Sequence, residues 1–312
     1  MKKKLRKPIR LLTRLQGKFT ANMVNYVLPI VTNFGGKKSP VHHSDIAYHE
    51  WEDERMHLDV YAPASPGPHP VLVSYHGGAW MVGRRANLQR AGQYFARKGF
   101  VVFNCSYRLA PKHRFPTSVQ DALCALRWVH AHAAGFGGDP ARIGVWGDSA
   151  GGHLSAMMAV AQNVPGIQPH CDCAPAVDVP VKAAVHYYGV FDFSRFGRLR
   201  FPLVKGIMRG VLGRRLGDEA LLEAVSPERH ARKGHIPPTL LLCGDGDPLL
   251  LETKRYAKRL RSLGGDVKVR IYRGATHGFL NTWWTPAYRD SIQLAAAHFE
   301  RHLAPAAKRR AA

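Results

Sequence analysis

Short apolar runs alternate with helix-like segments along most of this chain, from about residue 44 onward. Each apolar run is bounded by Gly or Pro and has the length of a buried strand. Such alternation is typical of βα units wound around a mostly parallel sheet that helices flank. The runs expected to form strands are 56–61, 71–75, 100–107, 143–146, 181–188, 239–243 and 267–272. The segments expected to form helices are 88–98, 118–133, 153–163 and 288–303.

Residues 147–151 read Gly-Asp-Ser-Ala-Gly, directly after one expected strand and directly before an expected helix. Gly-x-Ser-x-Gly at a strand-to-helix turn presents its serine as a nucleophile, and the glycines leave room where the two backbones approach. The five-residue pattern alone arises by chance in about one chain in ten of this length. The flanking strand and helix therefore carry the prediction that Ser149 is a nucleophile. Asp148 is expected to have a structural role.

A second glycine-rich turn, His-Gly-Gly-Ala-Trp at residues 76–80, follows the expected strand 71–75. Backbone N–H groups in such a turn can stabilise the negative charge of a tetrahedral intermediate, and removing one donor costs about 2.7–4 kcal/mol. The sequence predicts Gly77 and Gly78 as donors, with Ala150, the residue after the nucleophile, as the third. Without the serine motif, a plain strand-to-loop turn would be the simpler interpretation.

A general base and its orienting acid should follow the nucleophile in the order Ser, Asp or Glu, His, each in a loop after a strand. Asp245 and Asp247 follow the expected strand 239–243, and His277 follows the last expected strand. The order and placement predict a triad of Ser149, Asp247 and His277. Asp245 stays open as the alternative acid, because it lies in the same loop.

These motifs together resemble the hormone-sensitive-lipase-like (family IV type) carboxylesterases of the α/β-hydrolase superfamily, with further likeness to feruloyl-esterase-like proteins. The resemblance covers about residues 71–303. It rests on the motifs at residues 76–78, 107–111, 115–116, 121, 136–140, 147–153, 247–249 and 277–279. Ala79 departs from the pattern, because many members have a third glycine there.

The resemblance implies an α/β-hydrolase fold with a small helical cap, and neither a cofactor nor a metal. It implies Ser149, Asp247 and His277 as the triad, and an oxyanion hole made by Gly77, Gly78 and Ala150. The expected reaction is hydrolysis of carboxylic esters, of short to medium acyl chain, through an acyl-enzyme. Amide or formamide hydrolysis on the same triad stays open, because the same machinery serves both bonds.

The βα rhythm breaks in the stretch 194–236, where we expect an inserted cap. Part of this stretch mixes apolar and basic residues without an acid, which fits selection of acyl chains, selection of anionic substrates, or a solvated surface. The expected division is a basic amphipathic segment at 1–43, a catalytic domain at 44–303 and a basic tail at 304–312.

The chain carries 45 Lys and Arg against 22 Asp and Glu, a formal net charge of +23. This excess favours contact with anionic surfaces. The sequence contains no helix-turn-helix, aromatic RNA-binding or P-loop pattern, so nucleic acid is not an expected partner. A non-catalytic basic protein that binds membranes is the least favoured alternative.

The first 34 residues begin with a basic run and continue with a more apolar stretch. Helical spacing relates Ile9, Leu12, Phe19, Met23, Val27 and Ile30. This spacing predicts a basic amphipathic helix, too short and polar to span a bilayer and without a signal-peptide cleavage site. Two roles stay open, namely docking on anionic lipid and packing as a cap over the pocket.

The five cysteines are odd in number, and three of them lie in apolar strand or helix patterns. This usage suits reduced thiols and a cytoplasmic protein, with membrane association as a further possibility. Cys171 and Cys173 are one residue apart, which does not match the spacing of a zinc site. Nothing in the sequence predicts the oligomeric state.

Overall fold

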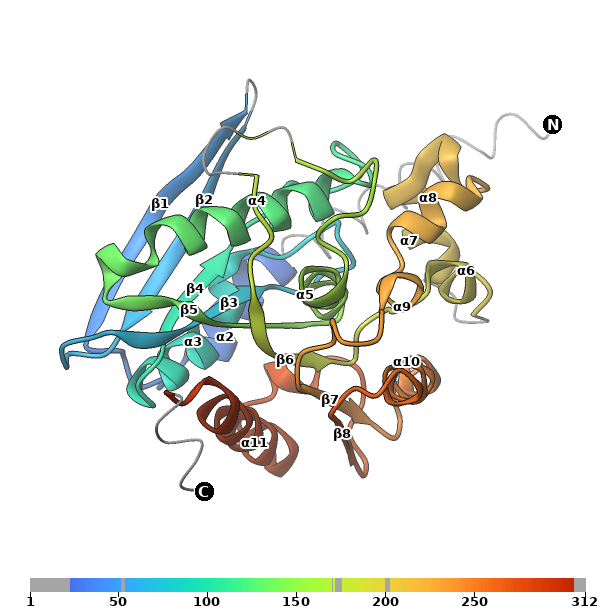
Figure 1. Cartoon of the computed structure of the whole chain (residues 1–312). Helices are drawn as coiled ribbons and strands as arrows, with labels where there is room; N and C mark the ends of the chain where they lie inside the picture. The colour runs from blue at the N-terminus through green and yellow to red at the C-terminus, as the bar shows by residue number, and fades with distance from the viewer. Residues whose placement is uncertain (1–22, 52–53, 170, 172–175, 200–202, 306–312) are drawn as a thin grey trace, which may run out of the picture.

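The computed structural model describes residues 23–51, 54–169, 171, 176–199 and 203–305. One mixed sheet runs through this part of the chain, and helices cover both of its faces (Figure 1). Its strands are β1 (Val41–Trp51), β2 (Glu54–Ala62), β3 (His69–Tyr75), β4 (Val101–Cys105), β5 (Gly138–Asp148), β6 (Val181–Tyr187), β7 (Thr239–Gly244) and β8 (Val267–Tyr272). Their order is β1-β2-β4-β3-β5-β6-β7-β8. The pairs β1–β2 and β2–β4 are antiparallel, whereas β3 to β8 pair with one another in parallel. The predicted mostly parallel α/β sheet is confirmed.

The longer helices form a layer on each face of the sheet. They are α3 (Gln89–Arg97), α4 (Thr117–His132), α5 (Ala150–Val160), α10 (Leu250–Ser262) and α11 (Pro286–Leu303). Successive strand residues point to opposite faces, so Val71 and Val145 pack with α4 and α5. Trp146 instead packs on Phe95 of α3, in the cluster that also contains Phe299 of α11. Because both faces are buried, the parallel strands are almost continuously apolar.

Two elements are not predicted by the sequence pattern. The 11 residues of β1 pair only with β2 at the edge of the sheet, and most of their side chains are exposed or half-buried. An edge strand of this kind has little apolar alternation. Helix α10 is strongly charged on its outer face and buries only a narrow stripe that includes Tyr256 and Leu260. Both elements therefore lack the apolar signal on which the prediction depends.

Short helices fill the chain between β6 and β7, where an inserted cap is expected. They are α6 (Phe193–Phe196), α7 (Val204–Leu212), η4 (Gly213–Arg215), α8 (Glu219–Ala224) and α9 (Pro227–His230). The guanidinium group of Arg195 ties this region to the body, with Nη1 2.9 Å from Asp192 Oδ2 and Nε 3.0 Å from Glu252 Oε1. It also pairs with Glu228. The Asp192 and Glu252 side chains are buried, and the pair with Glu252 links the segment between β6 and β7 to α10.

The amino-terminal helix is described from Met23 onward, as η1 (Met23–Val27) and α2 (Leu28–Asn33). Ile9, Leu12 and Phe19 lie outside the described residues. Pro29 and Thr32 are buried against the body. The side chain of Asn33 fixes the end of α2, because it donates to Ala86 O at 2.9 Å and accepts from Arg90 N–H at 2.9 Å.

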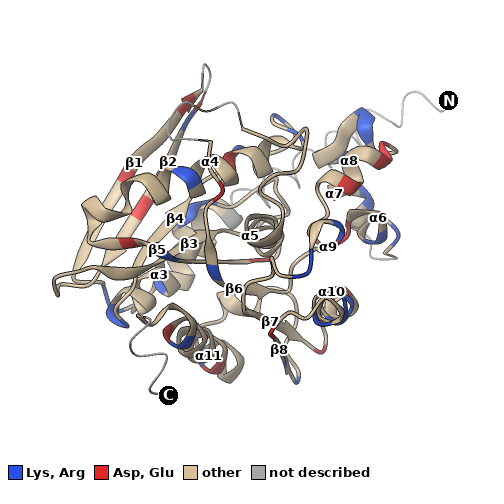
Figure 2. Cartoon of the chain, viewed as in Figure 1, with Lys and Arg blue, Asp and Glu red and all other residues tan. Residues whose placement is uncertain are grey.

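Charge is distributed over many elements. Lys and Arg occur on the cap helices, on α10 and along the flanking helices, with fewer acidic residues among them (Figure 2).

Within the described ranges, none of the helices has the length and apolar character that crossing a bilayer requires.

Candidate active site

Ser149 occupies a strained turn between β5 and α5. Its backbone has φ 54° and ψ −113°, a conformation that non-glycine residues rarely adopt. The Ser149 N–H donates to Tyr187 O of β6 at 2.9 Å, and its C=O accepts from His153 N–H of α5 at 3.0 Å. These two bonds hold the strained residue in place, as surrounding structure must where such a conformation persists.

The two glycines of the motif are required by close backbone contacts. A Cβ atom at Gly147 would overlap the backbone of Gly151 and Tyr75, and one at Gly151 would overlap Tyr75 O. Tyr75 is the last residue of β3, the neighbouring strand. Strand, turn and helix can therefore meet here only if both positions lack a side chain.

The predicted triad residues form one hydrogen-bonded chain. Ser149 Oγ lies 2.9 Å from His277 Nε2, and His277 Nδ1 lies 2.9 Å from Asp247 Oδ2. The Asp247 side chain is fully buried, and its Oδ1 accepts from Leu249 N–H at 2.7 Å. With Nδ1 donating to the carboxylate, Nε2 is left to accept the proton of the Ser149 hydroxyl.

Asp245, the alternative acid, points away from this chain. Its Oδ1 accepts from Gly274 N–H at 2.7 Å, and the residue is exposed. Asp247 turns inward from the same loop and reaches His277. The geometry thus brings Asp247, and not Asp245, to the imidazole.

The glycine-rich turn differs from the sequence prediction at one donor. Gly77 N–H donates to Asp148 Oδ1 at 2.8 Å, so it is not free to bind an oxyanion, and the prediction of Gly77 as a donor is wrong. Gly78 and Ala79 line the same cavity as Ser149, and within the described residues no protein acceptor takes their N–H groups. Ala150 begins α5, so its N–H has no partner inside that helix.

Asp148 is buried beside the nucleophile. Burial raises the pKa of its carboxyl group to about 6, although the hydrogen bond from Gly77 favours the ionised form. Its Oδ1 joins the serine turn to the glycine-rich turn across 71 residues of sequence. The expected structural role of Asp148 thus takes a definite form, as the link between the two turns.

The nucleophile opens into a cavity of about 540 Å³, a size typical of ligand pockets. Its walls carry apolar side chains from α2, the loop after β6, the stretch 194–236 and the loop after β7. These are Leu28, Val190, Phe196, Leu199, Leu203, Val204, Ile207, Pro248 and Leu249. No Lys or Arg lines the cavity among the described residues. The basic residues of the cap therefore give no support to selection of anionic substrates.

The amino-terminal helix and the tryptophan pair meet outside the cavity. Leu28 is the contribution of α2 to the cavity wall. Trp283 Nε1 donates to Val31 O at 3.2 Å, and neither Trp283 nor Trp284 lines the cavity. Trp283 packs beside the helix, and neither tryptophan contacts the site.

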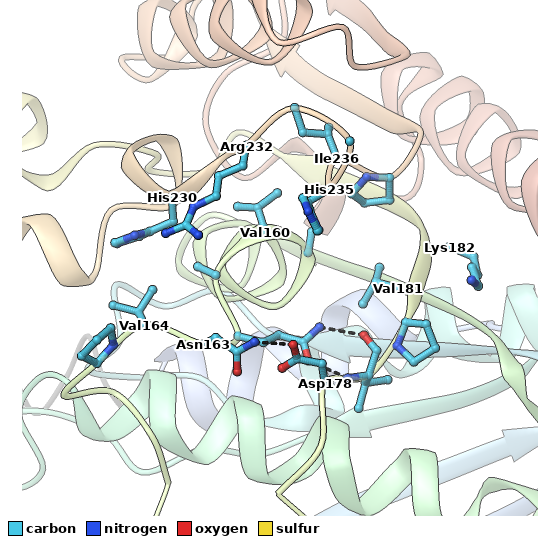
Figure 3. Close-up of a pocket in the computed structure, with 18 residues that line it drawn as sticks. Val160, Asn163, Val164, Asp178, Val181, Lys182, His230, Arg232, His235 and Ile236 are labelled. Atoms are coloured by element: carbon cyan, nitrogen blue, oxygen red, sulfur yellow. Dashed lines mark hydrogen bonds between the residues drawn. The ribbon is translucent and has the colours of Figure 1, made fainter.

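A second hollow of about 610 Å³ lies at the other end of α5 (Figure 3). It is formed by residues 159–165, 178–182 and 230–237, next to the amino-terminal ends of β6 and β7. His230, Arg232 and His235 project from one side of it (Figure 3). Ligands of parallel α/β sheets bind at the carboxyl ends of the strands, where Ser149 lies, so this hollow is separate from the triad.

The described residues contain no group of three His, Cys, Asp or Glu side chains placed to hold a metal ion. Cys105, Cys124 and Cys243 are buried, and Cys171 is half-buried. Cys173 lies outside the described residues.

Residues 58–257 match the BD-FAE family. The probable carboxylic ester hydrolase LipM of Mycobacterium tuberculosis is 34% identical over 71% of this chain and 52% of its own length. The carboxylesterase NlhH of the same organism is 31% identical over 68% of this chain and 67% of its own length. The chain spans about half to two-thirds of the length of these curated relatives.

Solved esterases share most of this architecture. A hyperthermophilic esterase from the archaeon Pyrobaculum calidifontis superposes with a TM-score of 0.78 at 26% identity, over 91% of this chain and 92% of the other. EstE1, a thermostable carboxylesterase cloned from a metagenomic library, gives 0.78 at 27% identity, over 92% of this chain and 98% of the other. The chain therefore belongs to the BD-FAE family, in the hormone-sensitive-lipase-like branch of the α/β-hydrolases.

Proposed function

We propose that this chain hydrolyses carboxylic esters with an apolar acyl group, through an acyl-enzyme formed on Ser149. The observation that carries the proposal is the hydrogen-bonded chain from Ser149 through His277 to Asp247, which opens into a cavity with apolar walls. The similarity to carboxylesterases supports an ester as the bond that is cleaved.

In the first half-reaction, Ser149 Oγ attacks the ester carbonyl while His277 Nε2 accepts its proton. Asp247 accepts a hydrogen bond from Nδ1 and stabilises the imidazolium that forms. The tetrahedral intermediate collapses, the C–O bond to the alcohol breaks, and His277 gives its proton to the departing oxygen, so that the neutral alcohol leaves and the imidazole is neutral again. An ester to Ser149 remains.

In the second half-reaction, water occupies the place that the alcohol vacates. His277 takes one of its protons as the oxygen attacks the acyl carbon, and the second tetrahedral intermediate forms. Collapse returns the proton to Ser149 Oγ and releases the carboxylic acid. Each cycle thus consumes one ester and one water and leaves the protein unchanged.

The oxyanion of both intermediates is stabilised, in this proposal, by the N–H groups of Gly78, Ala79 and Ala150. Gly78 and Ala79 face the cavity and have no acceptor among the described residues, and Ala150 adds the N–H that begins α5. Such donors are effective because they are fixed before the charge develops. Gly77 has a positioning role instead, through its bond to Asp148.

The substrate preference follows from the walls of the cavity. Apolar side chains from the cap at residues 194–236 surround the space in front of Ser149, and its volume of about 540 Å³ suits a short to medium acyl chain. A carboxylate on the acyl group would lose its hydration there without gaining a cationic partner. We therefore expect neutral esters to be preferred.

The test is hydrolysis of p-nitrophenyl esters of increasing chain length by the wild type, Ser149→Ala and a control, Ser262→Ala. Ser262 is exposed at the end of α10 and does not line the cavity. We expect Ser149→Ala to lose at least about 10³-fold in kcat, whereas the control keeps its activity. A fluorophosphonate probe should label the wild type and the control only. Full activity of Ser149→Ala would refute the proposal.

Amide hydrolysis is distinguished by paired substrates. The p-nitrophenyl ester and the p-nitroanilide of the same acid share the acyl group and differ in the bond that breaks. The ester should react faster by a margin larger than the difference in their uncatalysed rates. An equal or greater enhancement for the anilide would identify an amidase.

A further inference from the structure

We propose that the protein docks on anionic lipid bilayers through the outer face of η1 and α2, with the mouth of the catalytic pocket beside the docked surface. Docking itself does not require the proposed ester hydrolysis. Only the supply of an ester from the bilayer to Ser149 rests on that function.

The first observation is an apolar face that is turned outward. Eleven large apolar side chains are exposed in the described part of the chain, and six of them lie within residues 23–34. They are Met23 (42%), Tyr26 (60%), Val27 (41%), Ile30 (71%), Val31 (43%) and Phe34 (73%). A concentration of this kind marks an interaction surface, whereas apolar residues scattered singly need no explanation.

The second observation is that the helix packs on the body by other residues. Pro29 and Thr32 are buried, and Asn25 Oδ1 accepts from Gly83 N–H at 2.6 Å. These contacts hold the helix with Tyr26 and Ile30, which are four residues apart, on its outer side. The apolar face is therefore surplus to the packing of the helix.

The third observation is the position of this face at the rim of the cavity. Leu28 of α2 lines the cavity from one side, and Leu203, at the start of α7, lines it from the cap while remaining 64% exposed. The ring of Trp284, which is 50% exposed, lies 5.8 Å from the ring of Trp283, whose Nε1 donates to Val31 O. Tryptophan favours the interface between lipid and water. A molecule that leaves the bilayer here meets an apolar rim.

The fourth observation is an excess of basic residues in this part of the sequence, eight of them before the first described residue. No acidic residue precedes Asp45, whereas residues 1–44 contain ten Lys and Arg. Lys37 and Lys38 are exposed just after α2, and the guanidinium group of Arg84 lies over the Tyr26 ring at 5.6 Å. Clusters of basic residues beside an amphipathic helix bind anionic lipids.

The charge also selects the bilayer over a second copy of the chain. A symmetric dimer through this face would bring the same surface of each copy together, and with it the two sets of basic residues. Phospholipid headgroups offer the opposite charge, and the acyl region beneath them accepts Ile30 and Phe34. An anionic bilayer satisfies both parts of the surface.

The experiment measures co-sedimentation of the full chain with vesicles of phosphatidylcholine alone or mixed with phosphatidylglycerol. The test variant is Ile30→Ser/Phe34→Ser, and the matched control is Leu216→Ser/Leu251→Ser, which removes two exposed apolar side chains elsewhere. We expect the wild type and the control to bind the anionic vesicles, and the test variant to bind at least tenfold more weakly. High salt should release the wild type.

Two outcomes would overturn the proposal. One is unchanged binding by Ile30→Ser/Phe34→Ser. The other is a wild-type dimer that this variant converts to monomers without any loss of vesicle binding, which would identify a second copy as the occupant. Binding by Ser149→Ala and hydrolysis of a soluble acetate ester by the test variant are measured in parallel, so failure of docking and failure of the proposed function are distinguishable.

Discussion

Asp148 precedes the nucleophile directly in sequence, but its carboxylate accepts a hydrogen bond from the glycine-rich turn at residues 76–80. Its Oδ1 accepts from Gly77 N–H, and a Cβ at Gly77 would approach Oδ2 to 2.6 Å, so turn and carboxylate fit closely. Gly77 directly precedes Gly78 and Ala79. The bond to Asp148 therefore orients the peptide groups that we propose as oxyanion donors.

Asp148→Ala should lower kcat by about tenfold or more with little change in KM, because loss of a complete oxyanion donor costs about 10²–10³ in kcat and this substitution only misplaces two of them. Asp148→Asn keeps an oxygen that can accept from Gly77 N–H and should recover most of the rate. Steady-state kinetics on one p-nitrophenyl ester decide the matter. If the Asn variant were as slow as the Ala variant, the hydrogen bond would not be the cause.

The order of the triad along the chain could be predicted from the sequence, because each member follows a strand of a parallel sheet. The choice between Asp245 and Asp247 could not, since it depends on which side chain the loop turns inward. The error at Gly77 has the same origin. Nothing local in the glycine-rich turn indicates that a carboxylate 71 residues away accepts its N–H.

At the scale of elements, α7 has one face toward the substrate and one toward solvent. Val204 and Ile207 line the cavity, whereas Lys205 is exposed on the same helix. The break in the βα rhythm predicts that a cap exists here. The mixture of apolar and basic residues does not predict which of them meet the substrate, because the orientation of a short helix is set by its packing.

Ile207→Trp should shorten the preferred acyl chain, since the larger side chain occupies space in the cavity. We expect kcat/KM for a long-chain ester to fall about 10-fold or more relative to the acetate, in line with the cost of misfitting a few methylenes. Lys205→Trp adds the same bulk on the outer face and serves as the control. A parallel loss in both variants would point to a general disturbance of the cap.

At the scale of the whole molecule, four buried histidines are held neutral. Burial lowers the pKa of His76, His153 and His298 to about 4 and that of His186 to about 3. At His153 both ring nitrogens are engaged, with Nδ1 accepting from the Trp80 indole N–H at 3.1 Å and Nε2 bonded to Val225 O at 2.8 Å. A second ring proton would find no acceptor there.

The free energy of unfolding should therefore fall as the pH drops from about 6.5 toward 4. In this range these histidines bind protons in the unfolded chain but stay neutral in the folded protein. Between pH 7 and pH 5 the loss is about 2 kcal/mol per histidine, and Asp148, whose pKa is raised, offsets about 1 kcal/mol. Urea titrations at several pH values measure this dependence. His298→Gln should make this dependence shallower, because it removes one of the buried imidazoles whose pKa is lowered.

The fold class could be predicted from the sequence because buried parallel strands and their helices alternate strongly along the chain. For the amino-terminal helix, the same kind of pattern does not predict which residues are buried. Helical spacing relates Met23, Val27 and Ile30, yet all three are exposed, and the contact with the body is made by Pro29 and Thr32. Periodicity detects an apolar face but does not say whether the protein or its surroundings will cover it.

Leu28 and Ile30 are two residues apart on a helix of only six residues. The first side chain forms part of the chamber where the substrate reacts, and the second is 71% exposed. The outer side of α2 is therefore separated from the chamber by a single turn of backbone. We expect detergents and dispersed oil, which can bind the exposed face of α2, to change the turnover of a fully dissolved ester. The helix would then make the activity sensitive to the surrounding medium while it also lines the active site.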